Sequence, residues 1–148
     1  MTTTLWYVAT PYSKYPGGIE EAYKLACRCA AKLILAGIPC ISPIAHSHGI
    51  AEHGCIDPRD HKIWMPADRA IMRACTGLIV VVAEGWAESF GVREEIRTFE
   101  SAEKPIVRWD PQQEPPLRDL IVAAYYEKTL TPEAWAVAEN RLLGGADN

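Results

Sequence analysis

The sequence predicts an α/β domain in which a parallel sheet of about four to five strands is flanked by helices. Short β-prone runs alternate with stretches of helical periodicity, and this alternation with short connections is typical of a parallel sheet covered on both faces. Residues 77–83 form a continuous β-branched run, as a strand buried on both faces should. Together these observations favour a Rossmann-like or flavodoxin-like architecture with two extra C-terminal helices.

Composition limits the domain count and the partners. The 148 residues are 49% hydrophobic, which predicts a single domain over residues 1–148 with residues 110–148 as a helical C-terminal extension. The net charge of −4 implies no basic surface, so no nucleic-acid polymer is expected as a partner. No apolar run approaches the ~20 residues of a membrane span, so no membrane partner is expected. Scattered cysteines and an N-terminus without signal-peptide features predict a cytoplasmic protein with reduced thiols.

The chain is expected to begin with a strand and a helix. Residues 5–9 form a short β-prone run that ends in the turn Thr10-Pro11. Apolar side chains then recur at helical spacing over residues 19–33, and Gly37 is placed to end this helix.

The middle of the chain is expected to contain two further strands, a histidine-rich segment and a second helix. Residues 38–42 form a short strand, and residues 43–63, which hold all four histidines, are interpreted as a long loop. Proline is favoured in the first turn of a helix, so a helix is predicted from Pro66 to about Ala74. Residues 77–83 follow as the strongest strand of the chain.

The last third is expected to add helices and one more strand. In order, the predicted elements are a helix over about 91–102, a strand over 105–109, a proline-rich connector over 112–116, and closing helices over about 117–128 and 132–143. Thr131 is placed as the N-cap of the last helix and Pro132 at its first position.

Ligands of such folds bind beyond the carboxyl ends of the strands, where the strand order reverses. The candidate segments are therefore residues 7–13, the residues that follow Ser42, and residues 84–95. All three are expected to meet at one edge of the sheet.

Two carboxylates lie on apolar helix faces. Glu95 falls within the stripe formed by Val92, Ile96 and Phe99, and Asp68 lies on the apolar face of the preceding helix. A carboxylate in such a position must be paired, hydrogen-bonded or protonated, because an unpaired buried charge costs several kcal/mol. Each residue could simply cap a helix or meet an arginine. Alternatively, two carboxylates in one pocket suit glycosidic chemistry.

Two further features bear on these carboxylates. Glu95 is expected in the first turn of its helix, where the helix dipole favours the charged form. Tyr7, near the end of the first strand, can hydrogen-bond a carboxylate, although, taken alone, an ordinary core position is the simpler explanation.

In this order, the motifs resemble those of the nucleoside 2-deoxyribosyltransferase superfamily. Its typical first strand reads Tyr-x-Ala-Gly-Pro, and this chain has Tyr7-Val8-Ala9-Thr10-Pro11. Its later signature, Asp/Ser-x-Gly-x-x-x-Glu, is matched over residues 89–95, followed by Lys104-Pro105 before a strand. An aspartate shortly before the middle strand is also typical, and Asp68 matches it. The resemblance covers residues 5–109, with Thr10 departing from the usual glycine.

The chain is most similar to an uncharacterised branch of this superfamily. That branch keeps a Ser-Pro-Ile stretch followed by a histidine after the second strand, here the region from Ser42 to His48. The branch is similar to nucleotide N-glycosidases, so the resemblance implies cleavage or exchange of a base on a (deoxy)nucleoside.

The resemblance also implies roles for single residues. Glu95 would attack the anomeric carbon and form a glycosyl ester, Tyr7 would orient Glu95, and Asp68 would contact the base or assist its departure. A second base or water would then complete transfer or hydrolysis with retention, and neither a metal nor a cofactor is required. Beside these catalytic residues, the implied substrate contacts are Ala9, Pro11, Ser13, Trp64, Ser89 and Gly91.

Ser89 bears on the substrate class. Superfamily members that act on free nucleosides often carry aspartate here, whereas members that act on nucleoside 5′-monophosphates resemble this chain in carrying serine. A carboxylate would repel a phosphate, while a hydroxyl and the N–H groups of a helix start can donate to it, with Ser13 and Lys14 as further donors. Alternatively, Ser89 merely caps the helix.

Other chemistries find less support. The four histidines and Cys55 crowd one segment, but their spacing fits no standard zinc pattern. No phosphate-binding glycine motif for ATP or NAD occurs. Among functional roles, a substrate-gating segment in which Trp64 stacks on a base is preferred, and the ordinary alternative is a surface loop whose histidines contact solvent. Two alternatives stay open: a noncatalytic nucleotide-binding module of the same fold, and a metal-assisted nucleotide hydrolase.

A homodimer or higher homo-oligomer is also expected. The two C-terminal helices carry more apolar surface than one small sheet needs, namely Leu120, Ile121, Ala124, Tyr125, Trp135, Val137, Ala138 and Leu142.

Overall fold

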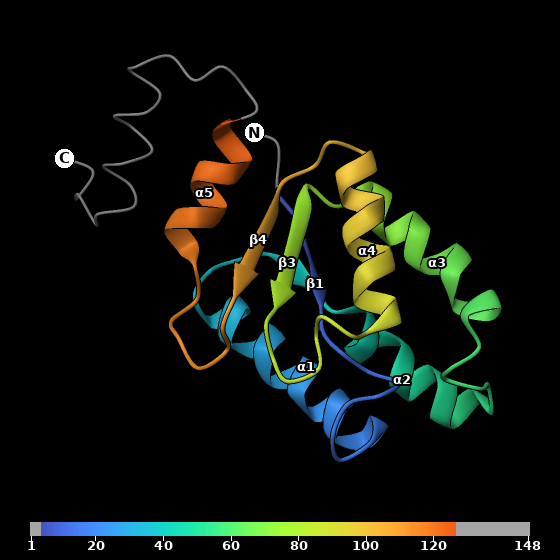
Figure 1. Cartoon of the computed structure of the whole chain (residues 1–148). Helices are drawn as coiled ribbons and strands as arrows, with labels where there is room; N and C mark the ends of the chain where they lie inside the picture. Colours follow the sequence, from blue (N-terminus) through green and yellow to red (C-terminus); the bar gives the residue numbers. More distant parts are fainter. Residues whose placement is uncertain (1–3, 127–148) are drawn as a thin grey trace.

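The computed structural model describes residues 4–126. Its centre is a parallel sheet with the strand order β2-β1-β3-β4 (Figure 1). The strands are β1 (Trp6–Ala9), β2 (Cys40–Ile41), β3 (Gly77–Val81) and β4 (Ile106–Trp109). The α/β class and the parallel sheet are confirmed, with four strands in the described residues. Because β2 and β3 flank β1 on opposite sides, the strand order reverses at β1, which opens a crevice beyond its carboxyl end.

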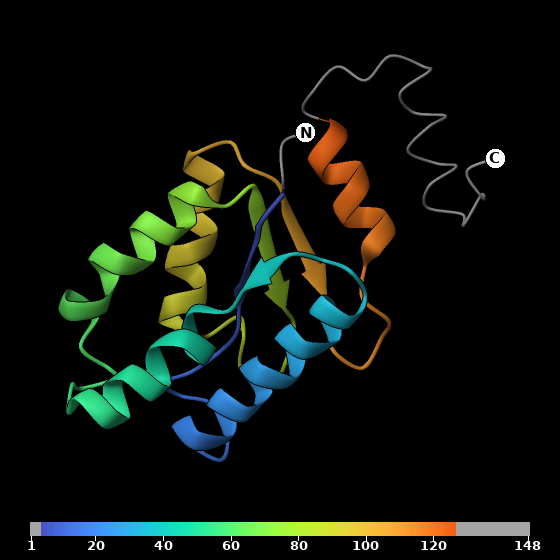
Figure 2. The ribbon, with the colours of Figure 1, turned by 180° about the vertical axis from the view of Figure 1, so that it is seen from behind.

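Helices cover both faces of the sheet (Figures 1 and 2). The helices are α1 (Ile19–Leu35), α2 (Pro43–Gly54), α3 (His61–Ala74), α4 (Phe90–Ser101) and α5 (Leu117–Tyr126). On one face, α1 and α5 pack on Trp6 and Val8 of β1 and on alternate residues of β3. On the other face, α3 and α4 pack on Tyr7 and Ala9 and on the intervening residues of β3. This division follows from the period of two along a strand.

The prediction of a long loop over residues 43–63 is wrong, because α2 occupies much of this segment. The side chain of Ser42 accepts a hydrogen bond from the Ala45 N–H at 3.1 Å, and Pro43 stands at the first helical position. A serine N-cap followed by proline is a standard helix start. The sequence signal for α2 was therefore the pair Ser42-Pro43.

The predicted start of the next helix is also wrong. α3 begins at His61, and the side chain of Asp60 caps it by accepting from the Lys62 N–H at 3.1 Å. Pro66 lies inside the helix. It stands in the second turn and therefore gives up one intrahelical hydrogen bond.

The predicted end of the first helix is confirmed. Gly37 follows the end of α1 with a φ of +82°, in the left-handed region that favours glycine. Its N–H bonds the Ile34 carbonyl, and the N–H of Ile38 bonds that of Leu33, the pattern of a Schellman motif. The chain then turns directly into β2.

At the C-terminal end, α5 confirms the first of the two closing helices, while the predicted helix over residues 132–143 lies outside the described residues. Leu120 is buried against the sheet, so this side chain is not available to a partner subunit, contrary to the expectation. Within residues 4–126, none of the helices is both long enough and apolar enough to span a membrane.

Candidate active site

A cavity of about 190 Å³ lies beyond the carboxyl end of β1, among the β1–α1 segment and the helices α2, α3 and α4. This is the edge of the sheet that the sequence predicts. The cavity brings together six predicted site residues: Ser13, Trp64, Asp68, Ser89, Gly91 and Glu95. Its volume is below the range of about 300–1,000 Å³ typical of ligand pockets, so a nucleotide would extend into the mouth.

Glu95 is held from the core side by Tyr7. The Tyr7 hydroxyl donates a hydrogen bond of 2.9 Å to Oε1 of Glu95. Tyr7 is fully buried on β1, and its ring packs against Phe99 with the centroids 5.7 Å apart. Because Phe99 and Glu95 lie one helical turn apart on α4, the same helix face carries both the packing and the polar contact.

The surroundings of Glu95 favour its neutral form. Burial raises the pKa of Glu95 to about 8, and the nearby Asp68 carboxylate adds to the rise, while the hydrogen bond from Tyr7 opposes it. The expectation that Glu95 lies in the first turn of its helix is wrong. α4 begins at Phe90, which leaves Glu95 in the second turn, and the dipole effect weakens beyond the first.

Asp68 shares the cavity with Glu95 and shows the same tendency. Burial raises the pKa of Asp68, and His46 and His61 oppose this rise. The pKa of Tyr7 is also raised, first by burial and then by the two carboxylates, so Tyr7 stays a hydrogen-bond donor. Two carboxyl groups with raised pKa values in one cavity are typical of acid–base and nucleophilic catalysis.

The N-terminus of α4 opens onto the cavity. Ser89 is its N-cap, with Oγ accepting from the Val92 N–H at 3.4 Å, and Ser89 and Gly91 both line the cavity. The helix-cap interpretation of Ser89 therefore holds, and it does not exclude a ligand contact. The free N–H groups of this first turn form an anion-favouring end of the helix.

Not every predicted contact reaches the cavity. Ala9 and Pro11 are fully buried and do not line it. Trp64 does line it, and its ring is fixed by a 2.9 Å hydrogen bond from Nε1 to the Asp57 carbonyl. That Trp64 stacks on the base of a substrate stays a prediction.

Sequence reasoning missed several lining residues. Thr10 lines the cavity, and its buried hydroxyl has no hydrogen-bond partner within the described residues. Thr10 stands where the superfamily that the motifs resemble usually has glycine, and this departure was the available signal for its position in the cavity. Tyr12 lines the cavity from the same segment, as does Lys14, which the sequence analysis named as a possible phosphate donor. The remaining lining residues, contributed by α2, the α2–α3 segment, α3 and the start of α4, are Ile44, Ser47, Pro58, His61, Met65, Met72, Phe90 and Glu94.

The Lys104-Pro105 motif has a structural role. Lys104 Nζ donates hydrogen bonds to the carbonyls of Met72, Arg73 and Cys75, at distances of 3.1, 2.8 and 2.8 Å. These carbonyls belong to the C-terminal end of α3, where a cation is favoured by the helix dipole. Lys104 therefore fixes the helix that carries Asp68.

Within residues 4–126, no group of three or more histidine, cysteine or acidic side chains is arranged to hold a metal ion. The histidines are instead divided. His46 and His61 oppose the rise in the pKa of Asp68, whereas His48 contacts Glu20 of α1.

Residues 4–111 match the model of a protein family whose description is "Domain of unknown function (DUF1937)". The match includes every residue of the cavity and ends shortly after β4. No curated protein matches the chain.

Proposed function

The chain belongs to the family of domains of unknown function described as DUF1937, and from its site we propose that it cleaves the N-glycosidic bond of a nucleoside or nucleoside 5′-monophosphate. The observation that carries the proposal is the hydrogen bond between Tyr7 and Glu95 at the edge of a cavity that also holds Asp68. This arrangement provides a nucleophile, a group that orients it and a second carboxyl for proton transfer.

In the first step, an oxygen of ionised Glu95 attacks the anomeric carbon of the sugar. The bond to the base nitrogen breaks, and its electron pair leaves with the base. Asp68, whose pKa is raised by burial, donates a proton to the departing base. Tyr7 keeps the attacking carboxylate in one orientation throughout, because its buried ring has little freedom to move.

In the second step, water attacks the same carbon of the glycosyl ester and releases Glu95. The ionised Asp68 accepts the proton of that water, which restores both groups. A second base in place of water would give base exchange instead of hydrolysis. Two successive inversions produce overall retention.

The start of α4 is proposed to bind the 5′-phosphate. Its free N–H groups, the Ser89 hydroxyl and the side chains of Ser13 and Lys14 lie around the same cavity and can donate to phosphate oxygens. A carboxylate at position 89 would repel the same group. We therefore assign a monophosphate substrate in preference to a free nucleoside.

A panel of nucleosides and their 5′-monophosphates, assayed for free base by chromatography, tests the proposal. Release of base by the wild-type protein, together with a sugar adduct on Glu95 detected by mass spectrometry of the trapped intermediate, is the expected result. Tight binding without release of base would instead favour the noncatalytic binding module. Loss of activity on adding a chelator would favour the metal-assisted hydrolase.

We also propose a cellular setting and an assembly state. All five cysteines, each within the described residues, are free thiols, which suits the reducing cytoplasm. A homo-oligomer is proposed because Ile34 and Leu35, at the end of α1, keep 59% and 88% of their surface exposed.

A further inference from the structure

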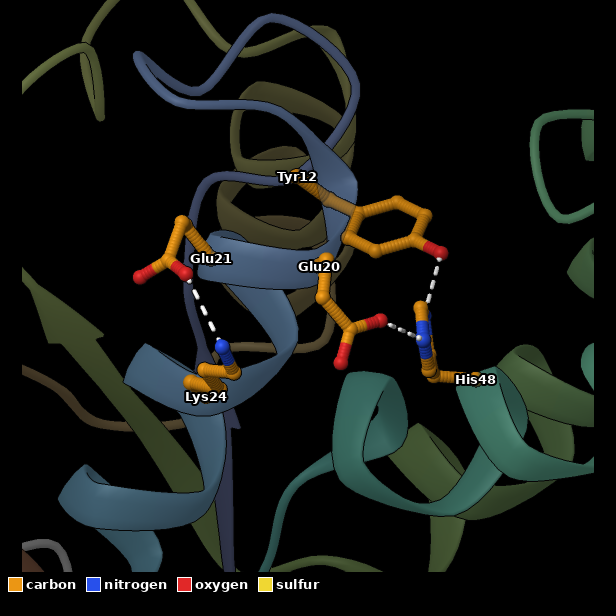
Figure 3. A network of polar contacts seen from close by, with 5 residues as sticks. All are labelled: Tyr12, Glu20, Glu21, Lys24 and His48. Carbon is orange, nitrogen blue, oxygen red and sulfur yellow. Dashed lines mark hydrogen bonds and ion pairs between the residues drawn. The ribbon is translucent and has the colours of Figure 1, made fainter.

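A chain of three side chains links the candidate active site to the outer surface of α1 (Figure 3). The Tyr12 hydroxyl lies 2.8 Å from Nδ1 of His48, and Nε2 of His48 lies 3.1 Å from Oε2 of Glu20. His48 is buried, with 8% of its side chain exposed, whereas Glu20 is 62% exposed. Tyr12 is the one member of the three that lines the cavity beside Glu95.

Three side chains hold the imidazole of His48: Tyr12, Tyr23 and Glu20. Its ring stacks on Tyr23 with the centroids 4.2 Å apart and the planes inclined by 12°. The ring of Tyr12 lies nearly perpendicular to it, with the centroids 6.0 Å apart. His48 and these side chains come from three elements: the β1–α1 segment, α1 and α2. A buried imidazole fixed by two hydrogen bonds and a stacked ring has a single orientation.

The carboxylate of Glu20 and a neutral imidazole together give both hydrogen bonds a direction. The Glu20 carboxylate can only accept, so Nε2 of His48 carries the proton on that side. In a neutral imidazole, Nδ1 is then an acceptor, and the phenol of Tyr12 must donate to it. The lone pairs of the Tyr12 oxygen stay available to a second partner.

We propose that Tyr12 is a substrate-contacting residue, and that His48 and Glu20 are positioning residues that hold its oxygen as a hydrogen-bond acceptor for a hydroxyl or amino group of the bound nucleotide. This inference rests on the proposed function, because it takes the ligand of the cavity to be a nucleotide. It assigns the Tyr12 side of the cavity to donor groups of the ligand. The phosphate, which only accepts, is thereby directed to the donors at the start of α4.

Steady-state kinetics of matched variants tests the contact. Tyr12→Phe keeps the ring and removes the oxygen, so KM for a nucleoside 5′-monophosphate should rise about 3- to 10-fold with kcat changed less than about 2-fold. Glu20→Gln should give a smaller rise in KM, because the amide can also donate and thereby disturb the proton arrangement of His48. Glu21→Gln is the control. Glu21 lies on the same turn of α1 but pairs with Lys24 at 3.0 Å, outside the network (Figure 3).

A double-mutant cycle separates positioning from simple structural support. His48→Ala should raise KM about as much as Tyr12→Phe, and the double variant should be no worse than Tyr12→Phe alone, because both remove one interaction. Where His48→Ala does not fold, His48→Asn replaces it. Additive effects would mean that His48 acts independently of Tyr12 and would overturn its positioning role.

Nitrogen chemical shifts of His48, measured by NMR at one pH, give a readout that stability alone would not move. Nε2 should be protonated and Nδ1 unprotonated, and adding the nucleotide to Glu95→Gln protein should shift the Nδ1 signal. In the Tyr12→Phe/Glu95→Gln protein that shift should vanish. A fully protonated imidazole, or equal shifts with and without the Tyr12 hydroxyl, would overturn the inference.

The outcomes distinguish the inference from the function on which it rests. Unchanged KM in Tyr12→Phe, in a protein that still releases base, overturns only the inference. Failure of the wild-type protein to bind or cleave any nucleotide of the panel overturns the proposed function and the inference with it.

Discussion

The hydroxyl of Tyr7 donates a hydrogen bond of 2.9 Å to Oε1 of Glu95, although 88 positions separate the two residues in the chain. Tyr7 stands on the central strand β1, and Glu95 stands on α4, which packs on the same face of the sheet. The contact therefore exists only in the folded protein. Its geometry is set by the core packing of Tyr7 against Phe99 and not by flexible surface groups.

Replacing the proposed nucleophile should abolish turnover. Glu95→Gln keeps the shape of the side chain and a hydrogen-bond acceptor for Tyr7, but an amide cannot form the glycosyl ester, so base release should fall by about 10³-fold or more. Glu100→Gln, an exposed substitution on the same helix, is the matched control and should keep normal activity. Turnover within tenfold of wild type in a folded Glu95→Gln protein would remove Glu95 from this role.

The dependence of kcat/KM on pH should report the ionisation of Glu95. Because the first step needs Glu95 ionised and Asp68 protonated, the dependence of kcat/KM on pH should be bell-shaped, with one limb near the Glu95 pKa of about 8. Asp68→Asn removes a negative charge that raises this pKa, so the midpoint of this limb should move to lower pH. Tyr7→Phe removes a hydrogen bond that lowers the pKa, so the midpoint should move to higher pH. Shifts in the same direction in both variants would contradict this assignment.

Stability should depend on pH through the same residue. The pKa of Glu95 is about 8 in the folded protein against 4.5 for the free side chain, so the neutral carboxyl stabilises the fold fully below about pH 4.5. That contribution is lost as the pH rises through about 8. Glu95→Gln does not titrate, so its free energy of unfolding should rise relative to that of the wild type by about 5 kcal/mol between pH 4.5 and pH 9. Urea titrations at a series of pH values measure the difference, which a constant offset across pH would refute.

Substrate preference should reverse at position 89. Wild-type protein should favour a nucleoside 5′-monophosphate over the nucleoside by roughly a hundredfold or more. Two charge-assisted hydrogen bonds to the phosphate, at ~1.5–3 kcal/mol each, give this preference. Ser89→Asp should favour the free nucleoside. Aspartate is as good an N-cap as serine, so α4 should keep its start. The comparison is kcat/KM for both substrates in both proteins, and equal wild-type values would leave Ser89 as a helix cap alone.

The chain should form a homodimer or larger assembly. Ile34 and Leu35 are exposed at the end of α1, and an apolar pair of this kind is stabilised by contact with a partner subunit. Light scattering at micromolar concentration should give at least twice the mass of 16.4 kDa. Leu35→Lys should reduce the association, whereas a monomeric wild-type protein would contradict the expectation.

The elements that sequence reasoning located correctly are those with redundant signals. Residues 77–81 form β3 within a β-branched run, and Gly37 ends α1 because its φ of +82° excludes most other residues. α2 was missed because its 12 residues carry little apolar periodicity, so only the cap at Ser42 marked it. Pro66 misled for the opposite reason, since proline in a second turn looks the same in sequence as proline in a first turn.

Some residues of the candidate site also carry a sequence signal and others do not. Glu95 and Asp68 could be predicted because a carboxylate on an apolar helix face is a local anomaly. The network of Tyr12, His48 and Glu20 could not. Its members are ordinary residues in their own segments, and only the approach of α1 to α2 brings them within hydrogen-bond distance. Partnerships between distant residues leave no periodic trace in a single sequence.

The alternation of side chains along β1 gives the two faces of the sheet different tolerance to substitution. Trp6 and Val8 face α1 and α5, while Tyr7 and Ala9 face the helices that build the cavity. Substitutions beneath α5 can thus alter thermal tolerance while the reacting groups keep their places. Mutant libraries aimed at new substrates should vary residues of α2, α3 and the start of α4, where substitutions change the cavity and leave the sheet unchanged. In evolutionary terms, the two sides of one four-residue strand can drift at different rates.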